Sequence, residues 1–72
     1  MTRGYSEKML AEVEAATPAG EPDVALGFRD IWRGMGLWAP VTVRNALVEL
    51  NRQGRVTREG DPSYWKYRRR PE

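Results

Sequence analysis

An amphipathic segment between positions 41 and 53 constrains the fold of this 72-residue chain more than any other feature. Its apolar residues recur at i, i+3, i+4 and i+7, on one face of an α-helix: Val43, Ala46, Leu47 and Leu50. Gly54 ends the helix, because glycine readily adopts the left-handed conformation that closes a helix. The sequence therefore predicts a helix over residues 41–53 with one buried stripe and one polar face.

Two further helices are predicted before it. Ser6 caps a first helix that continues to Ala16. The prolines and the glycine of residues 17–22 end that helix in a loop. A second helix is expected over about residues 28–34, whereas residues 23–27 form either its beginning or a short strand.

The part that follows Gly54 predicts a β-hairpin. Residues 55–58 and 64–68 are expected to be its strands, joined by a turn over residues 59–63. Successive side chains of a strand point to opposite faces, so Trp65 and Tyr67 are both expected to point toward the helices. The predicted fold is a small α+β domain with three helices and a C-terminal two-stranded hairpin.

Residues 6–68 are expected to form one domain, between a flexible N-terminus over residues 1–5 and a loose basic tail over residues 69–72. A domain of this size has a thin core. Its tryptophans are therefore expected inside that core: Trp32, Trp38 and Trp65.

The composition excludes several classes of function. The chain has no Cys and no His, which removes disulfides, the commonest metal ligands and the usual general base. It also lacks a phosphate-cradling glycine-rich loop and a catalytic triad, so we expect no enzyme, metal, cofactor or small-molecule substrate. No apolar run approaches the roughly 20 residues that span a membrane, and no signal peptide is recognisable. A cytoplasmic protein without a membrane partner is expected.

The element order resembles the winged helix-turn-helix fold, and the segment that begins at Thr42 is similar to the recognition helix of GntR-type bacterial transcription regulators. That family's pattern, Thr-Val-Arg-x-Ala-Leu-x-x-Leu-x-x-x-Gly, is met from Thr42 to Gly54. The resemblance implies a bacterial or phage DNA-binding domain in which Thr42 and Arg44 contact DNA. Ala39-Pro40 stands where the family has a serine or threonine cap, and the family's glycine-rich wing is absent.

Residues 60–66 resemble the wing of the Z-alpha family, which binds left-handed nucleic acid through a proline and a tryptophan. Pro62 and Trp65 match those two residues. The asparagine and tyrosine that this family needs on its helix are Arg44 and Val48 here. Binding to Z-form nucleic acid is therefore not expected.

Basic charge gathers in the second half of the chain. Residues 37–72 hold eight basic and four acidic residues, whereas residues 1–36 hold four basic and six acidic. This imbalance favours a polyanion-facing surface in the second half, and a solvated acidic face turned away from DNA in the first. The predicted DNA contacts are Thr42, Arg44, Asn45, Arg52, Arg55, Arg58, Tyr64, Lys66 and Arg68.

These residues suit different parts of a duplex. Arg44 matches guanine and Asn45 matches adenine in the major groove, whereas Thr42 either bonds a phosphate or caps the helix. The hairpin cations neutralise phosphates or pair with Glu59 or Asp61 across the strands. The arginines at positions 69 and 70 enter a minor groove or stay loose.

Two functions follow from these observations. The first is duplex DNA binding by a small transcription regulator or architectural factor, with residues 41–53 in the major groove and residues 55–68 on the backbone. Tight specific binding is expected to need a homodimer or tandem sites, because one copy makes few phosphate contacts. The alternative is a protein–protein interaction module that binds a polymerase subunit or another regulator. An exposed Trp32 or Trp38 would favour the alternative.

Overall fold

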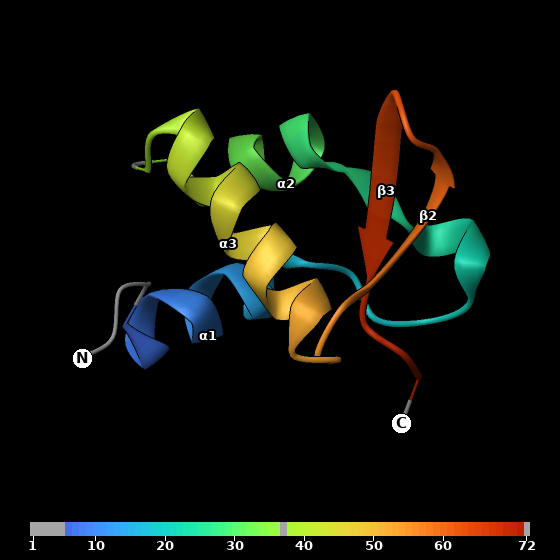
Figure 1. The fold of residues 1–72 in the computed structure, drawn as a ribbon, viewed down its shortest axis with the longest axis horizontal. Helices are drawn as coiled ribbons and strands as arrows, with labels where there is room; N and C mark the ends of the chain where they lie inside the picture. Colours follow the sequence, from blue (N-terminus) through green and yellow to red (C-terminus); the bar gives the residue numbers. More distant parts are fainter. Residues whose placement is uncertain (1–5, 37, 72) are drawn as a thin grey trace.

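The computed structural model describes residues 6–36 and 38–71. Within them the chain forms three α-helices, one short 3₁₀ turn and a three-stranded antiparallel sheet (Figure 1). The elements are α1 (Glu7–Ala16), η1 (Pro22–Val24), β1 (Leu26–Gly27), α2 (Phe28–Met35), α3 (Pro40–Arg52), β2 (Thr57–Asp61) and β3 (Tyr64–Arg68). Figure 1 shows α1, α2 and α3 gathered on one side of the molecule, with the hairpin of β2 and β3 and the turn η1 on the other. The predicted flexible segment over residues 1–5 lies outside the described residues, as does residue 72.

Helix α3 confirms the strongest sequence prediction. It begins one residue before the predicted range, at Pro40. Proline suits this position because the first N–H groups of a helix have no hydrogen-bond partner within the helix, so the missing N–H costs nothing. The predicted stripe is completely buried: Val43, Ala46, Leu47 and Leu50. Gly54 has a φ of +80°, and the next amide, that of Arg55, donates to the Leu50 carbonyl at 2.9 Å. The helix therefore ends through a left-handed glycine, as expected.

The other two helices also agree with the prediction. The Ser6 hydroxyl caps α1 by accepting a hydrogen bond from the Met9 amide at 3.1 Å. Helix α2 ends at Met35, one residue beyond the predicted boundary. The sequence did not decide between helix and strand for residues 23–27. In the structure, residues 23 and 24 belong to the 3₁₀ turn η1 and residues 26 and 27 form the strand β1.

The sheet differs from the predicted two-stranded hairpin in strand number and in the bounds of its first hairpin strand. Its order is β1-β3-β2, with Leu26 of β1 opposite Tyr67 of β3. Strand β2 begins at Thr57 rather than at residue 55, because the amides of Arg55 and Val56 bond to the last turn of α3. The strand then continues to Asp61, so that only two residues form the turn.

The core lies where the three helices meet the inner face of β3. Tyr67 is buried there, as predicted, beside Ile31 and the stripe of α3. The prediction that all three tryptophans lie inside the core was wrong, because each is half-buried at its edge. The indole N–H of Trp32 donates to the Trp38 carbonyl at 2.7 Å, and that of Trp38 donates to Glu12 at 3.2 Å. An indole N–H needs such a partner, which keeps these rings near the surface.

The predicted loose tail is held at its first residue. The amide of Arg69 donates to the Pro18 carbonyl at 2.7 Å, and its guanidinium donates to the Thr17 carbonyl at 2.8 Å. The Arg69 carbonyl in turn accepts from the Gly20 amide at 3.0 Å. These bonds fix Arg69 against the loop after α1. In the described part of the chain, no helix has the length and apolar character that crossing a membrane requires.

Candidate functional site

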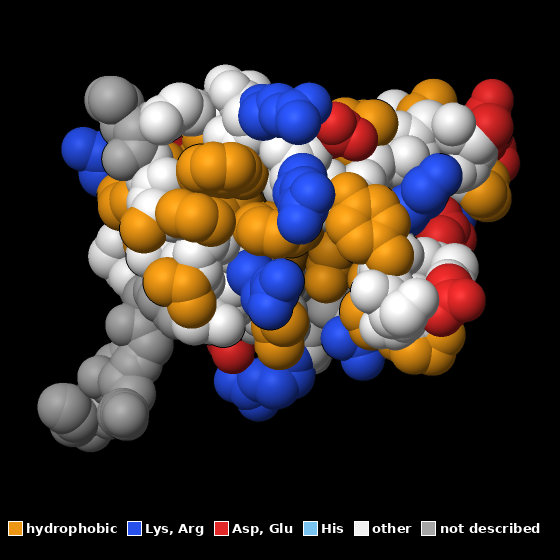
Figure 2. Space-filling view, turned by 90° about the horizontal axis from the view of Figure 1, so that it is seen from above, with side chains coloured by type: hydrophobic (Ala, Val, Ile, Leu, Met, Phe, Trp, Pro, Cys, Tyr) orange, Lys and Arg blue, Asp and Glu red, His pale blue; other side chains and the backbone are white. Residues whose placement is uncertain are grey.

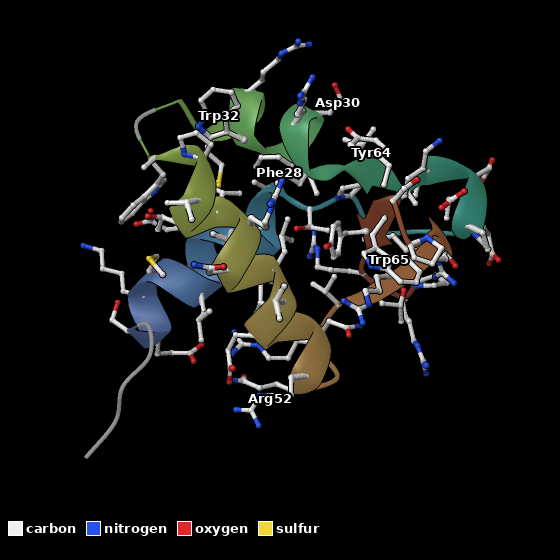
Figure 3. The ribbon with its side chains drawn as sticks, turned by 45° about the horizontal axis from the view of Figure 1, so that its top comes forward. Phe28, Asp30, Trp32, Arg52, Tyr64 and Trp65 are labelled. Atoms are coloured by element: carbon white, nitrogen blue, oxygen red, sulfur yellow. The ribbon has the colours of Figure 1, made fainter. Side chains whose placement is uncertain are left out.

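A hollow of about 340 Å³ lies between α3, the start of α2 and the β2–β3 hairpin. Its walls carry four aromatic side chains and two cations: Phe28, Tyr64, Trp65, Tyr67, Arg44 and Arg58. Val48, Pro62 and Ser63 complete the lining, which contains no acidic residue among those described. Figure 3 shows Phe28 on the helical side, with Tyr64 and Trp65 on the hairpin. We call this site the basic hollow.

Each arginine of the basic hollow is stacked on an aromatic ring. The guanidinium carbon of Arg44 lies 4.9 Å from the ring centre of Phe28, and that of Arg58 lies 4.6 Å from the ring centre of Trp65. Such stacking holds a guanidinium in place while its N–H groups, which lie in its plane, stay available. Neither arginine has a carboxylate partner within the described residues. The basic hollow therefore carries two fixed and uncompensated positive charges.

Tyr67 adds a hydroxyl group to the floor of the basic hollow. Burial raises the pKa of the Tyr67 hydroxyl, and the nearby charges of Arg58 and Arg44 offset part of that effect. A tyrosine hydroxyl, whose ordinary pKa is about 10, is protonated at neutral pH and can donate a hydrogen bond. Two guanidinium groups and one O–H donor suit an anion such as a phosphate.

Gly27 permits the aromatic wall formed by Tyr64. The Tyr64 ring approaches Gly27 so closely that a Cβ atom at this position would collide with the ring and its hydroxyl. The φ of Gly27 is −69°, which any residue can adopt, so the requirement is for space and not for backbone freedom. Strand β1, which the sequence left open, therefore helps to shape the site.

Arg55, predicted as a phosphate contact, points elsewhere. Its guanidinium contacts Glu7 and Glu14 of α1 at 2.7 Å each, and it does not line the basic hollow. Hydrogen bonding to Arg55 lowers the pKa of Glu7. The predicted solvated acidic face is therefore partly a clamp that ties α1 to the end of α3. We leave Arg55 out of the proposed contacts for this reason.

The remaining predicted contacts are divided between paired and available side chains. Arg68 follows the cross-strand alternative, because it pairs with Glu59 at 2.7 Å and its side chain is only 14% exposed. Arg52 pairs with Glu49 at 2.9 Å near the far end of α3 (Figure 3). Asn45 and Lys66 are exposed, whereas Thr42 is half-buried.

The structure thus brings together three of the predicted contacts, Arg44, Arg58 and Tyr64, around one hollow. Sequence reasoning missed Phe28, Trp65 and Tyr67 as site residues, because all three carry the periodicity of core positions. Figure 2 shows a row of Lys and Arg side chains across one face of the molecule, with hydrophobic side chains on both sides of it.

Comparisons of the chain with protein-family models, with curated proteins and with solved structures found no match. The described residues contain no cluster of three or more acidic side chains placed to hold a metal ion. The arrangement of charges and rings around the basic hollow is therefore the observation from which a function can be argued.

Proposed function

We propose that this protein binds duplex DNA, with α3 in the major groove and the β2–β3 hairpin on the adjacent backbone. The observation that carries the proposal is the pair of ring-stacked arginines, Arg44 and Arg58, which share one hollow and have no carboxylate partner in the described chain. Two uncompensated charges held in place favour a polyanion as partner. In this arrangement one sugar-phosphate strand of the duplex lies in the basic hollow, between α3 and the β2–β3 hairpin.

The order of the elements supports this docking. The chain forms α1, β1, α2, α3 and then the β2–β3 hairpin, and this order is compatible with a winged helix-turn-helix. In that motif the first half of the recognition helix reaches the base edges. Asn45 is exposed in that half of α3 and matches adenine, whereas Arg44 lines the basic hollow and faces the phosphates of the strand held there. Arg58 and Lys66 then face the phosphates from the hairpin.

The small number of proposed contacts bears on how a transcription regulator or architectural factor of this size would act on DNA. Only Arg44, Arg58 and Lys66 are proposed as charged contacts, and so few contacts give weak binding to arbitrary sequences at physiological salt. Specific binding by one copy would be modest, so we propose that the protein acts at tandem or palindromic sites, as a homodimer or in arrays.

The test is an NMR titration of the ¹⁵N-labelled protein with a duplex. We expect chemical-shift changes in the first half of α3 and at the indole N–H of Trp65, with little change in α1. Arg58→Ala should weaken binding, whereas Arg52→Ala should leave it nearly unchanged. Arg52 is the matched control, because it is exposed but already paired with Glu49. Changes confined to α1, or equal effects of the two variants, would contradict the proposed docking.

The alternative function, a protein-interaction module, has less support. Trp32 and Trp38 are half-buried, and both indole N–H groups are bonded inside the molecule. Val41, 62% exposed, is the most exposed of the large hydrophobic side chains described. The next most exposed, Val48 and Tyr64, line the basic hollow itself. Scattered exposed side chains of this kind are ordinary for a protein surface. Duplex DNA is therefore the partner that we propose.

A further inference from the structure

The basic hollow offers more aromatic surface than contact with a phosphate requires. Guanidinium groups alone can donate the hydrogen bonds that a phosphate accepts. This site adds the ring of Tyr64, which is 43% exposed, beside the two ring-stacked arginines. Its volume of about 340 Å³ is at the lower end of the range for small-molecule sites. These features fit an occupant with both a flat π-surface and a negative charge.

A nucleotide has both properties. Nucleobases stack on aromatic rings and on the planes of arginine guanidinium groups, in single-stranded nucleic acids above all. Here each guanidinium already lies on a ring, so that a base placed against it would extend an existing stack. The phosphate of the same nucleotide would meet the uncompensated charges and the hydroxyl of Tyr67.

A base inside a duplex cannot reach such a site, because its neighbours cover both of its faces. Taking it out costs unstacking and unpairing energy, and this cost is smallest for a nucleotide that is already unpaired. The geometry points to an unpaired nucleotide as the preferred occupant: the basic hollow binds its base and its phosphate together. This inference depends on the proposed function, because α3 and the hairpin must first hold the adjacent duplex.

The experiment compares three DNA probes by fluorescence anisotropy at one low salt concentration. The first is a fully paired duplex, the second carries one additional unpaired adenine, and the third carries an abasic site in place of that adenine. We expect the adenine bulge to bind about tenfold more tightly than the other two, a factor typical of stacking one base.

The other outcomes separate this inference from the proposed function. Equal affinity for all three probes would overturn the inference and leave duplex binding intact. Equal tightening by the adenine and the abasic bulge would also overturn it, because the protein would then recognise the distorted backbone alone. No binding to any probe would overturn the proposed function and this inference together.

Two variants test the aromatic wall. Tyr64→Ala removes an exposed ring, and Gly27→Ala places a methyl group where that ring lies. Both should reduce the ratio of the affinities for the adenine bulge and for the paired duplex from about tenfold to about one. Val41→Ala is the matched control, since Val41 is an exposed residue of α3 that does not line the basic hollow. If the preference persists in folded forms of both variants, as judged by circular dichroism, the assignment to the basic hollow is wrong.

Discussion

Arg55 and Arg58 are three residues apart, yet the structure places them in different surroundings. Arg55 is engaged with Glu7 and Glu14, whereas Arg58 lies over Trp65 with no carboxylate partner in the described residues. Replacing each by alanine removes the same charge from the protein. We expect Arg58→Ala to alter DNA binding and Arg55→Ala to alter stability.

The salt dependence of binding gives the magnitude. Each phosphate contact contributes about −0.9 to the slope of log affinity against log salt, so the three proposed cations give a slope of about −2.7. Affinity should then fall about 40-fold between 50 and 200 mM salt. Arg58→Ala removes one contact, which changes the slope to about −1.8 and the loss of affinity to about 12-fold. Arg55→Ala should leave the slope unchanged and lower the melting temperature by a few degrees, because it releases α1 from the end of α3.

Fluorescence anisotropy at four salt concentrations measures the slopes, and thermal unfolding followed by circular dichroism measures the stability. An unchanged slope for Arg58→Ala would refute the reasoning. A change of the slope from about −2.7 to about −1.8 in Arg55→Ala would also refute it. The guanidinium of Arg55, although paired with Glu7 and Glu14, would then be acting as a phosphate contact.

Three further predictions concern stability and are measured by urea or thermal unfolding. Gly34→Ala should stabilise the protein by about 0.5–1 kcal/mol, because Gly34 lies in α2 with open space around it; destabilisation would show that its surroundings are occupied. Leu50→Ala should cost about 2–5 kcal/mol and largely unfold so small a domain, since Leu50 is completely buried; a small effect would contradict the proposed core. Hydrogen bonding to Arg55 lowers the pKa of Glu7 below its ordinary value of 4.5, so the stability it contributes is present above pH 4.5 and lost as pH falls further. Arg55→Met should flatten this acid-induced loss, and an unchanged pH profile would rule out the clamp as its source.

The helices could be predicted because their signals are local. The stripe of α3, its closing glycine and the cap at Ser6 each act within a few residues of sequence. Strand β1 could not be assigned, because two residues show no alternation and its pairing partner is about 40 positions away. The start of β2 was misplaced because the left-handed turn at Gly54 uses the next two amides to close α3.

The sequence predicted three residues of the candidate site, namely two cations and, in the hairpin, Tyr64. Arg44 and Arg58 were expected as contacts, and they do line the basic hollow. The engagement of Arg55 could not be read from the sequence, since its partners belong to a helix more than 40 positions earlier. Phe28 and Trp65 resembled core positions because a ring that lies beneath an arginine has the periodicity of a buried residue. Tyr67 resembled a core position because it is buried.

The most direct test of the central claim is the affinity of the unmodified protein for a random-sequence duplex as salt is raised. We predict binding at 50 mM salt that weakens with a slope of about −2.7, the value for three phosphate contacts. No binding at 50 mM salt, or an affinity that does not change with salt, would contradict the account.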